Sequence, residues 1–300
     1  MTNIKSVLIT GSGSGLGRAT ALQFANAGYR VFAGVRDTHA APGHAAIVPV
    51  LLDVADPAQI AAAAELIDRE CPDGLTALVN MAGYTFYGPV EHTSDTAVSA
   101  LFDVVAFAPY RLANAVLPAL KRYARATGRR SKILNIISWA AFDATPFVGF
   151  YAAAKAAALR ITQAQFFELD RFGIDAVSIV PGMMKTQFIE HAEVEIRAAN
   201  AQLVPQARAD YGDSIDHMAT LSAAAPRNPI VASPAAIAAR IVAVASKRRA
   251  RSQYNFGIDT WLIGTMSRLL PLRLFEAIKR TMFGLRSSSQ AWRRSDKLVA

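Results

Sequence analysis

Short runs of apolar, mostly β-branched residues alternate with longer alanine-rich stretches along most of the chain. The short runs are almost continuously apolar, which is typical of strands that are covered by helices on both faces. They predict strands at 7–9, 31–33, 48–52, 75–79, 133–137 and 177–180, with a candidate last strand at 253–256. The longer stretches predict helices at 16–27, 57–70, 93–126, 150–171 and 234–247.

The regular order of strand and helix predicts the fold class. Strand–helix–strand units with right-handed crossovers build an α/β, doubly wound parallel sheet. We therefore expect one domain over residues 1–257. Within it, residues 183–230 contain several prolines and no clear strand, so we interpret them as a substrate loop. Residues 258–300 form a C-terminal extension.

Composition agrees with a folded globular protein. Of the 300 residues, 52% are apolar and 18% are charged, which argues against disorder. Cys71 is the only cysteine, so no intrachain disulfide can form, as is typical of a reducing compartment. Neither a secretory leader nor a run of about 18 apolar residues is evident. We expect a cytoplasmic protein.

The positive charge is concentrated near the C-terminus. The whole chain carries a net charge of +9, and residues 240–300, with 13 Lys/Arg and three Asp/Glu, carry +10 of it. The first 239 residues are therefore nearly neutral. Because the body of the domain is not basic, no nucleic-acid partner is expected.

A glycine-rich turn joins the first predicted strand to the first predicted helix, and it reads Thr10-Gly11-Ser12-Gly13-Ser14-Gly15-Leu16-Gly17. Glycines let the backbone approach a pyrophosphate, and the start of a helix offers free N–H groups and a positive dipole end. The strict G-x-G-x-x-G fingerprint is absent because Leu16 stands where its last glycine would be. By itself, the turn fits either a phosphate site or an ordinary flexible connection.

Further motifs follow in order along the chain. They are Asp53-Val54 after the third predicted strand, Asn80-Met81-Ala82-Gly83, Ser138, Tyr151-x-x-x-Lys155, and Pro181-Gly182 with Thr186. Together with T-G-x-x-x-G-x-G, this series over residues 4–257 resembles the ordinary-length branch of the short-chain dehydrogenase/reductase family, with steroid and retinol dehydrogenases among the similar members. Met81 replaces the second asparagine of the family's N-N-A-G.

The resemblance implies a Rossmann-type fold that binds a nicotinamide dinucleotide, and it assigns roles to individual positions. Ser138, Tyr151 and Lys155 would be the catalytic residues. The cofactor would be contacted by Thr10, Gly11, Ser12, Ser14, Gly15, Leu16, Gly17, Arg36, Asp53, Val54, Asn80, Ala82, Gly83, Tyr151, Lys155, Pro181, Gly182 and Thr186.

The end of the second predicted strand bears on the choice of cofactor. An acidic residue there would bind the ribose 2′-hydroxyl and repel a 2′-phosphate, and the position where NAD(H)-preferring members tend to carry aspartate is Val35. Arg36 could bind the phosphate through charge-assisted hydrogen bonds, with help from Arg18. We predict NADP(H). The alternative is that Arg36 pairs with Asp37 or faces solvent, which would leave NAD(H) acceptable.

Tyr151 and Lys155 lie four residues apart on a predicted helix, so their side chains share a face. An unperturbed phenol has a pKa of about 10. A nearby ammonium and an oxidised nicotinamide ring would lower the pKa of Tyr151 and let it act as general acid or base. Ser138 would hold the substrate oxygen, while the cofactor carries the hydride. Taken alone, Y-x-x-x-K also fits a surface pair.

One position departs from the family pattern. The family usually has an asparagine in a stretch like F-D-V-N-V-F, where it holds a water that links the lysine to solvent. Here the stretch is Phe102-Asp103-Val104-Val105-Ala106-Phe107, and Val105 cannot bind that water through its side chain. A second hypothesis is therefore an NADP(H)-binding protein with weak or no turnover.

The expected substrate side is strongly apolar, and it has few cations that could bind a carboxylate or phosphate. The apolar side chains are those of Tyr84, Phe86, Tyr87, Trp139, Phe142, Phe147, Met183, Met184 and Phe188. Because binding pockets are mostly apolar with a few placed polar groups, we expect a bulky lipophilic alcohol or ketone of steroid, retinoid or long-chain type. Part of this set could instead belong to the core.

The C-terminal extension shows apolar residues at helical spacing, interleaved with arginine and lysine. Such a helix could dock on an anionic membrane surface, or it could fold over the pocket or against a second subunit, which is the interpretation we favour. Similar members commonly form homodimers or homotetramers through their long helices. The five histidines are scattered, without H-E-x-x-H or C-x-x-C spacing, so no metal is expected.

Overall fold

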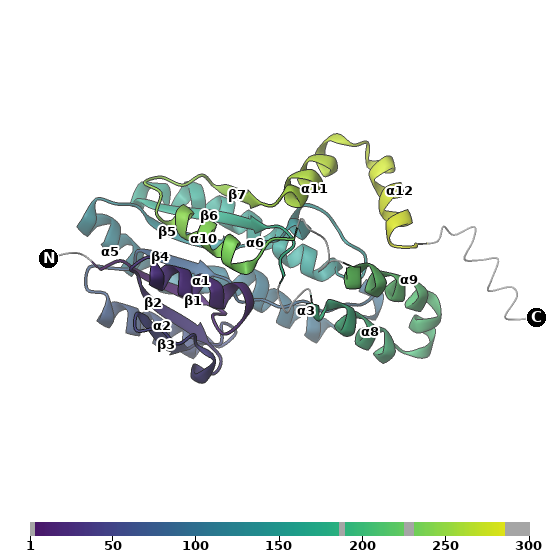
Figure 1. Cartoon of the computed structure of the whole chain (residues 1–300), viewed down its shortest axis with the longest axis horizontal. Helices are drawn as coiled ribbons and strands as arrows, with labels where there is room; N and C mark the ends of the chain where they lie inside the picture. The colour runs from purple at the N-terminus through teal and green to yellow at the C-terminus, as the bar shows by residue number, and fades with distance from the viewer. Residues whose placement is uncertain (1–3, 186–189, 225–230, 286–300) are drawn as a thin grey trace, which may run out of the picture.

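A seven-stranded parallel sheet forms the centre of the computed structural model, which describes residues 4–185, 190–224 and 231–285 (Figure 1). The strand order is β3-β2-β1-β4-β5-β6-β7, and every neighbouring pair is parallel. The strands are β1 (Ser6–Thr10), β2 (Arg30–Val35), β3 (Ile47–Leu51), β4 (Ala77–Asn80), β5 (Ser131–Ile136), β6 (Ile174–Pro181) and β7 (Gln253–Phe256). From β1 the chain adds β2 and β3 on one side of the sheet, and then β4 to β7 on the other side. This switch between β1 and β4 confirms the predicted doubly wound topology.

Helices cover both faces of the sheet, which explains the continuous apolar strands. Helices α1 (Gly15–Asn26) and α10 (Pro234–Ala245) pack on one face, while α2 (Pro57–Glu70), α4 (Ala108–Ala115) and α5 (Leu117–Thr127) pack on the other. In β1, Val7 and Ile9 belong to the first core and Leu8 belongs to the second. Because side chains alternate along a strand, a sheet that is buried on both faces needs apolar residues at every position.

The predicted helix over 93–126 is divided into shorter pieces. Helix α3 (Asp95–Phe102) runs into a π-helical turn, η3 (Asp103–Phe107), before α4 and α5. Two prolines, Pro109 and Pro118, stand near the starts of α4 and α5, where they remove N–H donors that a continuous helix would need. The π-helical turn surrounds Val105, and turns of this kind are frequent at functional sites.

By length and composition, Asp95–Ala115 is the one stretch among the described residues that could span a bilayer. In the fold, however, α3 and α4 pack against α6 (Gly149–Glu168), and α4 also packs against α2. The stretch is therefore part of the body of the domain, although Phe107 and Tyr110 leave some of its apolar surface exposed.

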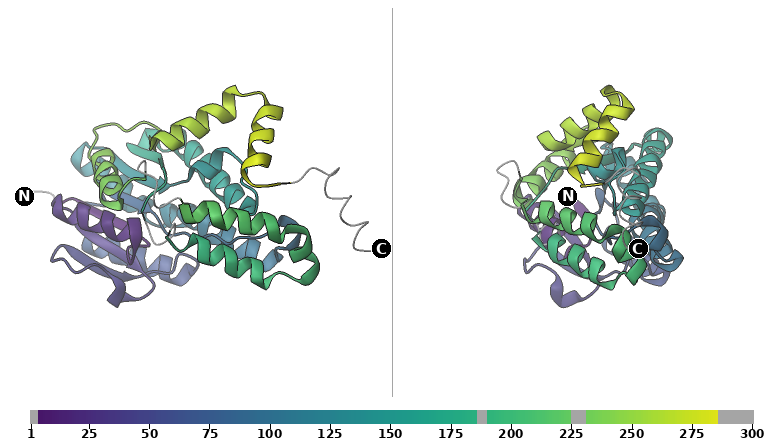
Figure 2. Two further views of the ribbon diagram at one scale, coloured as in Figure 1. Left: turned by 45° about the vertical axis from the view of Figure 1, so that its right-hand side comes forward. Right: turned by 90° about the vertical axis from the view of Figure 1, so that its right-hand side faces the viewer.

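Residues 183–230 contain more regular structure than the sequence indicated. Helices α8 (Ala192–Gln202) and α9 (Pro205–Ala224) pack side by side, where a substrate loop without regular elements was expected (Figure 2). Both helices are partly exposed and bury a narrow side, made mainly of Ala192, Ile196, Ile215, Met218 and Ala219. The narrow buried side explains the mixed polarity that hid these helices in the sequence.

Two further helices follow β7. Helix α11 (Ile258–Leu269) packs against the short 3-10 helix η4 (Trp139–Phe142), and α12 (Leu272–Met282) returns towards α9 (Figure 1). Phe283 is buried beside Ile215 and Met218 of α9. The prediction of one α/β domain with a C-terminal helical extension is thereby confirmed.

Candidate active site

The glycine turn packs closely against the segment that follows β4. Gly11 has a φ of +67°, and a Cβ atom at this position would lie 3.0 Å from the Cα atom of Ala82. A Cβ atom at Gly17 would overlap the carbonyl oxygen of Gly11. The Thr10 hydroxyl accepts hydrogen bonds from the backbone N–H groups of Met81 (2.9 Å) and Ala82 (3.0 Å). The two motifs therefore form a single unit in space.

The first turn of α1 offers an unblocked helix start. Its N-cap residue Ser14 makes no side-chain capping hydrogen bond, and no acidic residue lies in the first turn. The free N–H groups and the helix dipole suit an anion at this point. Ser12 and Leu16 point elsewhere, because the Ser12 hydroxyl donates to the Ile9 carbonyl at 2.9 Å and Leu16 is buried in the core. These backbone features fit the diphosphate of a nicotinamide dinucleotide.

Two arginines flank the end of β2 beside the glycine turn. Arg36 is exposed, and no ion pair to it is found within the described ranges. Asp37 is engaged elsewhere, because its carboxylate accepts a hydrogen bond from the His39 N–H at 3.0 Å. Arg18 donates to the Ala40 carbonyl at 3.3 Å, which holds it at the same corner. Arg36 therefore does not pair with Asp37, but it faces solvent, which is the other form of the alternative and leaves NAD(H) acceptable.

The residues after β3 have structural tasks of their own. The Asp53 carboxylate accepts a hydrogen bond from Ala55 N–H at 2.9 Å, and the Asp53 N–H donates to the Gln59 side chain at 2.7 Å. The Val54 side chain is buried in the core beneath. The cofactor contacts expected of Asp53 and Val54 stay a prediction, and they would have to come from the outer surface of this ordered loop.

Asn80 lies at the centre of an internal amide network. Its Nδ2 atom donates to Asn135 Oδ1 at 2.7 Å and to the Pro109 carbonyl at 3.2 Å. Asn135 in turn donates to the Thr162 hydroxyl on α6 at 2.8 Å. Asn80 thus joins β4 to β5, α4 and α6. The sequence pointed to Asn80 as a cofactor ligand, but it gave no sign of this positioning network.

Ser138 and the Tyr151–Lys155 pair meet at the carboxyl edge of the sheet. Ser138 follows β5, and Tyr151 and Lys155 occupy the first turns of α6. The Lys155 Nζ atom lies 5.8 Å from the centroid of the Tyr151 ring. Ser138 is held in place because its Oγ atom accepts a hydrogen bond from Ala140 N–H at 3.2 Å. A serine hydroxyl, a phenol and an ammonium are therefore assembled next to the glycine turn.

The electrostatics of Tyr151 differ from the sequence-based expectation. Burial raises the pKa of Tyr151 to about 12, although its hydrogen bond with the Ser138 side chain acts in the opposite direction. We had expected the nearby ammonium to lower this pKa. In the polypeptide alone, desolvation of the phenolate dominates, and Lys155 is not among the causes of the shift. Tyr151 is thus protonated at neutral pH and ready to donate a proton, whereas action as a base requires additional positive charge nearby.

Lys155 is anchored by a contact that the sequence did not indicate. Its Nζ atom donates to the Ile136 carbonyl at 2.8 Å, at the end of β5. Burial lowers the pKa of Lys155 to about 8, because the charged ammonium is poorly hydrated there. The ammonium can therefore release and regain a proton close to neutral pH.

Val105 lies beside this lysine. A Cβ atom at Gly83 would be 3.9 Å from both the Lys155 Nζ atom and the Val105 Cγ2 atom, so the three residues are neighbours. Val105 is 1% exposed and packs with Leu101 and Ala154. An apolar side chain therefore lies near the ammonium, at the position where the family usually has an asparagine.

Asp259 is a site-proximal residue that sequence analysis missed. Its carboxylate accepts a hydrogen bond from Met183 N–H at 2.6 Å and leaves no room for a Cβ atom at Gly182. Asp259 thus ties α11 to the end of β6, where Pro181 and Gly182 were predicted to face the nicotinamide. In the sequence, Asp259 is one of three acids in a basic C-terminal segment, and nothing there marks it as a residue near the site. Thr186 and Phe188 lie outside the described residues.

Several apolar residues predicted for the substrate side contribute to packing as well. Phe147 is buried with Ile215 and Phe283, and it adopts a left-handed backbone conformation (φ 65°) that is rare for a bulky residue. Its carbonyl accepts a hydrogen bond from Gly88 N–H at 2.9 Å. Tyr84, in contrast, is 40% exposed. The set is therefore divided between core and accessible surface.

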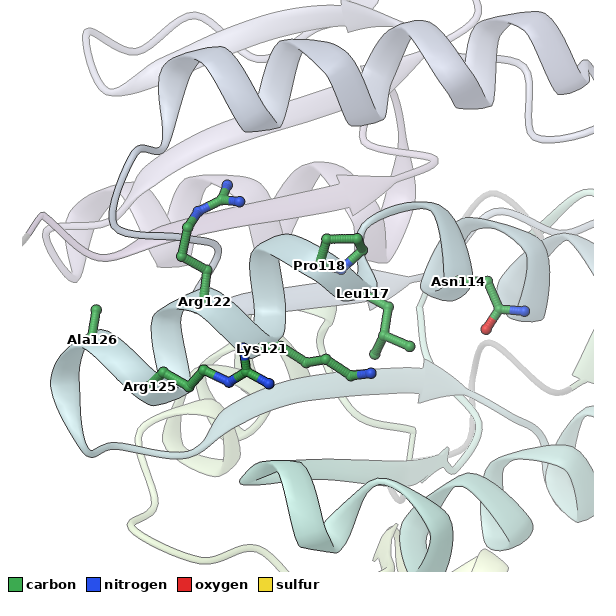
Figure 3. A pocket seen from close by; sticks show the side chains of 7 residues that line it. All are labelled: Asn114, Leu117, Pro118, Lys121, Arg122, Arg125 and Ala126. Atoms are coloured by element: carbon green, nitrogen blue, oxygen red, sulfur yellow. The ribbon is translucent and has the colours of Figure 1, made fainter.

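Two cavities lie away from the predicted cofactor-binding and catalytic residues. One, of about 770 Å³, runs along α5 and is lined by Asn114, Leu117, Pro118, Lys121, Arg122, Arg125 and Ala126 (Figure 3). The other, of about 550 Å³, lies at the amino edge of the sheet between Lys5, Arg129 and Lys247. Neither contains a residue predicted for the cofactor or for catalysis.

Comparison with known proteins identifies the family. The family model described as short chain dehydrogenase matches residues 5–197, which is more than half of the chain. The protein belongs to the short-chain dehydrogenase/reductase family. It is therefore an oxidoreductase of a family whose fold binds NAD(P), as the motifs indicated.

Similar sequences cover two thirds of the chain or more. An uncharacterized oxidoreductase of Escherichia coli strain K12, YbbO, is 28% identical over 91% of this chain and 93% of its own length. A galactitol 2-dehydrogenase of Agrobacterium fabrum is 32% identical over 77% of this chain and 94% of its own. A 3-ketodihydrosphingosine reductase of Bacteroides thetaiotaomicron is 29% identical over 69% and 72%.

Solved structures share the fold. A short chain dehydrogenase from Burkholderia cenocepacia in complex with NADP has a TM-score of 0.69 at 22% identity, covering 92% of this chain and 98% of its own. A 3-ketoacyl-(acyl-carrier-protein) reductase from Brucella melitensis complexed with NADH has a TM-score of 0.67 at 23% identity, covering 85% and 96%. Both nicotinamide cofactors thus occur among proteins of this fold.

Proposed function

We propose that this protein is an NADP(H)-dependent oxidoreductase that acts on a lipophilic alcohol or ketone of steroid, retinoid or long-chain type. The observation that carries the proposal is the assembly of Ser138, Tyr151 and Lys155 beside a helix start that is suited to a dinucleotide diphosphate. When bound, the nicotinamide supplies or accepts the hydride.

The side chains divide the remaining work of carbonyl reduction. Tyr151 is protonated at neutral pH and gives its proton to the oxygen that gains charge as the carbonyl is reduced. Ser138 places a second hydroxyl at the same oxygen and stabilises that charge. Lys155, whose pKa is about 8, supplies positive charge next to the phenolate that Tyr151 becomes. In alcohol oxidation the same groups act in reverse.

Apolar side chains around the reactive groups support a lipophilic substrate. Phe86 packs against Phe150 of α6, and Trp139 and Phe142 lie in the segment directly after Ser138. Among similar proteins, the name of one denotes a long-chain ketone reductase and that of another denotes a polyol dehydrogenase. The apolar surroundings favour the first type of substrate.

Turnover with a matched panel tests the substrate class. We expect NADPH-dependent reduction of long-chain and steroid ketones with a kcat/KM at least about 100-fold above that for ketoses, since each buried methylene contributes about 0.8 kcal/mol to binding. Initial rates of NADPH oxidation at 340 nm measure both. A preference for ketoses would remove the lipophilic assignment and leave the reaction class standing.

Arg36 is expected to select the phosphorylated cofactor. Arg36→Ala should weaken NADPH binding about 10- to 100-fold and leave NADH binding within about 3-fold, because a charge-assisted hydrogen bond contributes about 1.5–3 kcal/mol. Dissociation constants from nicotinamide fluorescence titrations provide the measurement. Asp37→Ala is the matched control, since its carboxylate is held by His39 N–H. Equal weakening of both cofactors by Arg36→Ala would contradict the prediction.

The burial of Val105 beside Lys155 supports a second candidate function, that of an NADP(H)-binding protein with weak or no turnover. If an asparagine-bound water is what this site lacks, Val105→Asn should raise kcat about 10-fold or more without changing the dissociation constant of NADPH. Val104→Asn, one position away, is the control. A wild-type kcat above about 1 s⁻¹, within the usual enzyme range, together with no gain in Val105→Asn, would exclude the weak-enzyme hypothesis.

A further inference from the structure

The two C-terminal helices expose an unusual amount of apolar surface. Their exposed large apolar side chains are Trp261, Leu269, Leu272, Leu274, Ile278 and Met282, with exposed fractions between 41% and 76%. Single exposed apolar residues are ordinary, but a cluster on two consecutive helices indicates an interaction surface. Both views of Figure 2 show α11 and α12 standing out from the body of the molecule.

Helix α12 is fixed to the domain along one side. The Lys279 Nζ atom donates to Asp143 Oδ1 at 2.7 Å and to the Ala144 carbonyl at 3.2 Å. Just beyond the helix, Phe283 is buried, and the His217 ring contacts the Met282 carbonyl at 3.1 Å. These contacts reach the 143–147 segment and α9, so the orientation of α12 relative to the active site is set by the fold.

A different side of α12 carries the exposed apolar residues. Leu274, Ile278 and Met282 are spaced four residues apart, so they form one stripe along the helix. Phe275 and Lys279, which contact each other, lie on the neighbouring side, and Lys279 also contacts the domain. The side that could act as a lid is therefore already in contact with the domain, and the stripe is available for something else.

The charged residues of α12 are mainly positive, and its two exposed arginines lie on the side away from the stripe. Arg273 and Arg280 are both exposed and lie two turns apart on one side of α12, and no ion pair to either is found among the residues that the structure describes. Glu276 is the only acid of the helix. The following residues 286–300 add four Lys/Arg and one Asp to the sequence.

We propose that α11 and α12 form a docking surface for an anionic lipid bilayer. A helix with an apolar stripe on one side and cations on the opposite side is the pattern of a helix that lies in the plane of a membrane interface. A second copy of this chain fits the surface less well, because it would bring together two segments that both carry a net positive charge. Docking through α12 would place the segment after Ser138 near the lipid phase.

Vesicle binding tests this proposal independently of the proposed reaction, because it requires no turnover. The full chain is sedimented with phosphatidylcholine vesicles and with vesicles of phosphatidylcholine and phosphatidylglycerol in a ratio of about 3 to 1. We expect partitioning at least about 10-fold stronger onto the anionic vesicles, and a loss of most of that difference in 0.5 M salt, since screening weakens surface electrostatics. Absence of binding to either vesicle would overturn the proposal.

Two paired variants assign any binding to this surface. Leu274→Glu with Ile278→Glu should lower partitioning about 10-fold or more, and both side chains are exposed, so the fold should be retained. Val194→Glu with Val204→Glu, which alters exposed apolar residues elsewhere, is the control and should bind like the wild type. Equal effects of the two pairs would contradict the assignment to α12.

Two further measurements separate the remaining outcomes. Tryptophan emission should shift to shorter wavelength on addition of anionic vesicles, and Trp261→Phe should remove most of that shift. Light scattering reports the oligomeric state of the wild type and of the Leu274→Glu, Ile278→Glu variant. If the wild type does not bind vesicles and the variant dissociates an oligomer, the surface belongs to a second copy of the chain and the membrane proposal is wrong.

Discussion

Tyr151→Phe is expected to lower the kcat for ketone reduction about 1000-fold, with the dissociation constant of NADPH changed less than about 3-fold. General acid–base catalysis contributes about 10²- to 10⁴-fold to rates, and phenylalanine keeps the ring while removing the hydroxyl that we propose as the proton donor. Tyr151 is partly buried and hydrogen bonded to Ser138, and it is protonated at neutral pH, since its pKa is raised to about 12. Steady-state rates together with cofactor titrations measure both quantities.

A neighbouring tyrosine provides the control for Tyr151. Tyr87 is also partly buried, and burial raises its pKa above the usual value, with the charges of Glu195 and Tyr151 adding to the effect. It packs with the cluster around Phe147. Tyr87→Phe should keep kcat within about 10-fold, because its hydroxyl is not needed for proton transfer. A large loss in Tyr87→Phe with a small one in Tyr151→Phe would transfer the proton-donor role to Tyr87.

Gly17→Ala is expected to abolish measurable NADPH binding and to lower the free energy of unfolding by about 3 kcal/mol. The added Cβ atom would overlap the carbonyl oxygen of Gly11 and press on the Cα atom of Ser12. Neither backbone atom can rotate away as a side chain could, so the turn or the start of α1 must move. Denaturant unfolding and a fluorescence titration with NADPH give the two values.

Gly43→Ala is the matched control for this substitution. A Cβ atom at Gly43 meets no other atom within 4 Å, and the residue does not have a positive φ. Stability and cofactor binding should both stay at wild-type values or improve slightly, since alanine restricts the unfolded chain. If Gly17→Ala bound NADPH as tightly as Gly43→Ala, the glycine turn would not be the diphosphate site.

Local patterns were sufficient for the strands and for most helices, because each depends on residues that are close in the sequence. The apolar runs at 7–9 and 133–137 lie within β1 and β5 or overlap them, and the first helix was predicted within one residue of its start. The prediction of one continuous helix over 93–126 was wrong. Pro109 and Pro118 indicate the breaks, but the strong apolar periodicity around them favoured a continuous helix.

The helices within 183–230 were missed for a different reason. α8 and α9 are stabilised by packing on each other and on Phe147 and Phe283, which are distant in the sequence. Each helix is only weakly amphipathic, so the local pattern of apolar and polar residues does not indicate a helix. Long-range burial supplied what local propensity lacked.

The sequence by itself determined the fold class and the family, and it singled out Ser138, Tyr151 and Lys155 as the proposed reactive groups, since these follow from short motifs in a fixed order. Only the tertiary structure decided how those groups are tuned: Tyr151 has a raised pKa, Lys155 donates to the Ile136 carbonyl, and Asp259 ties α11 to Gly182. Motifs record which side chains are present. Burial, hydrogen-bond partners and exposed helix faces depend on contacts between residues far apart in the chain, which no local pattern contains.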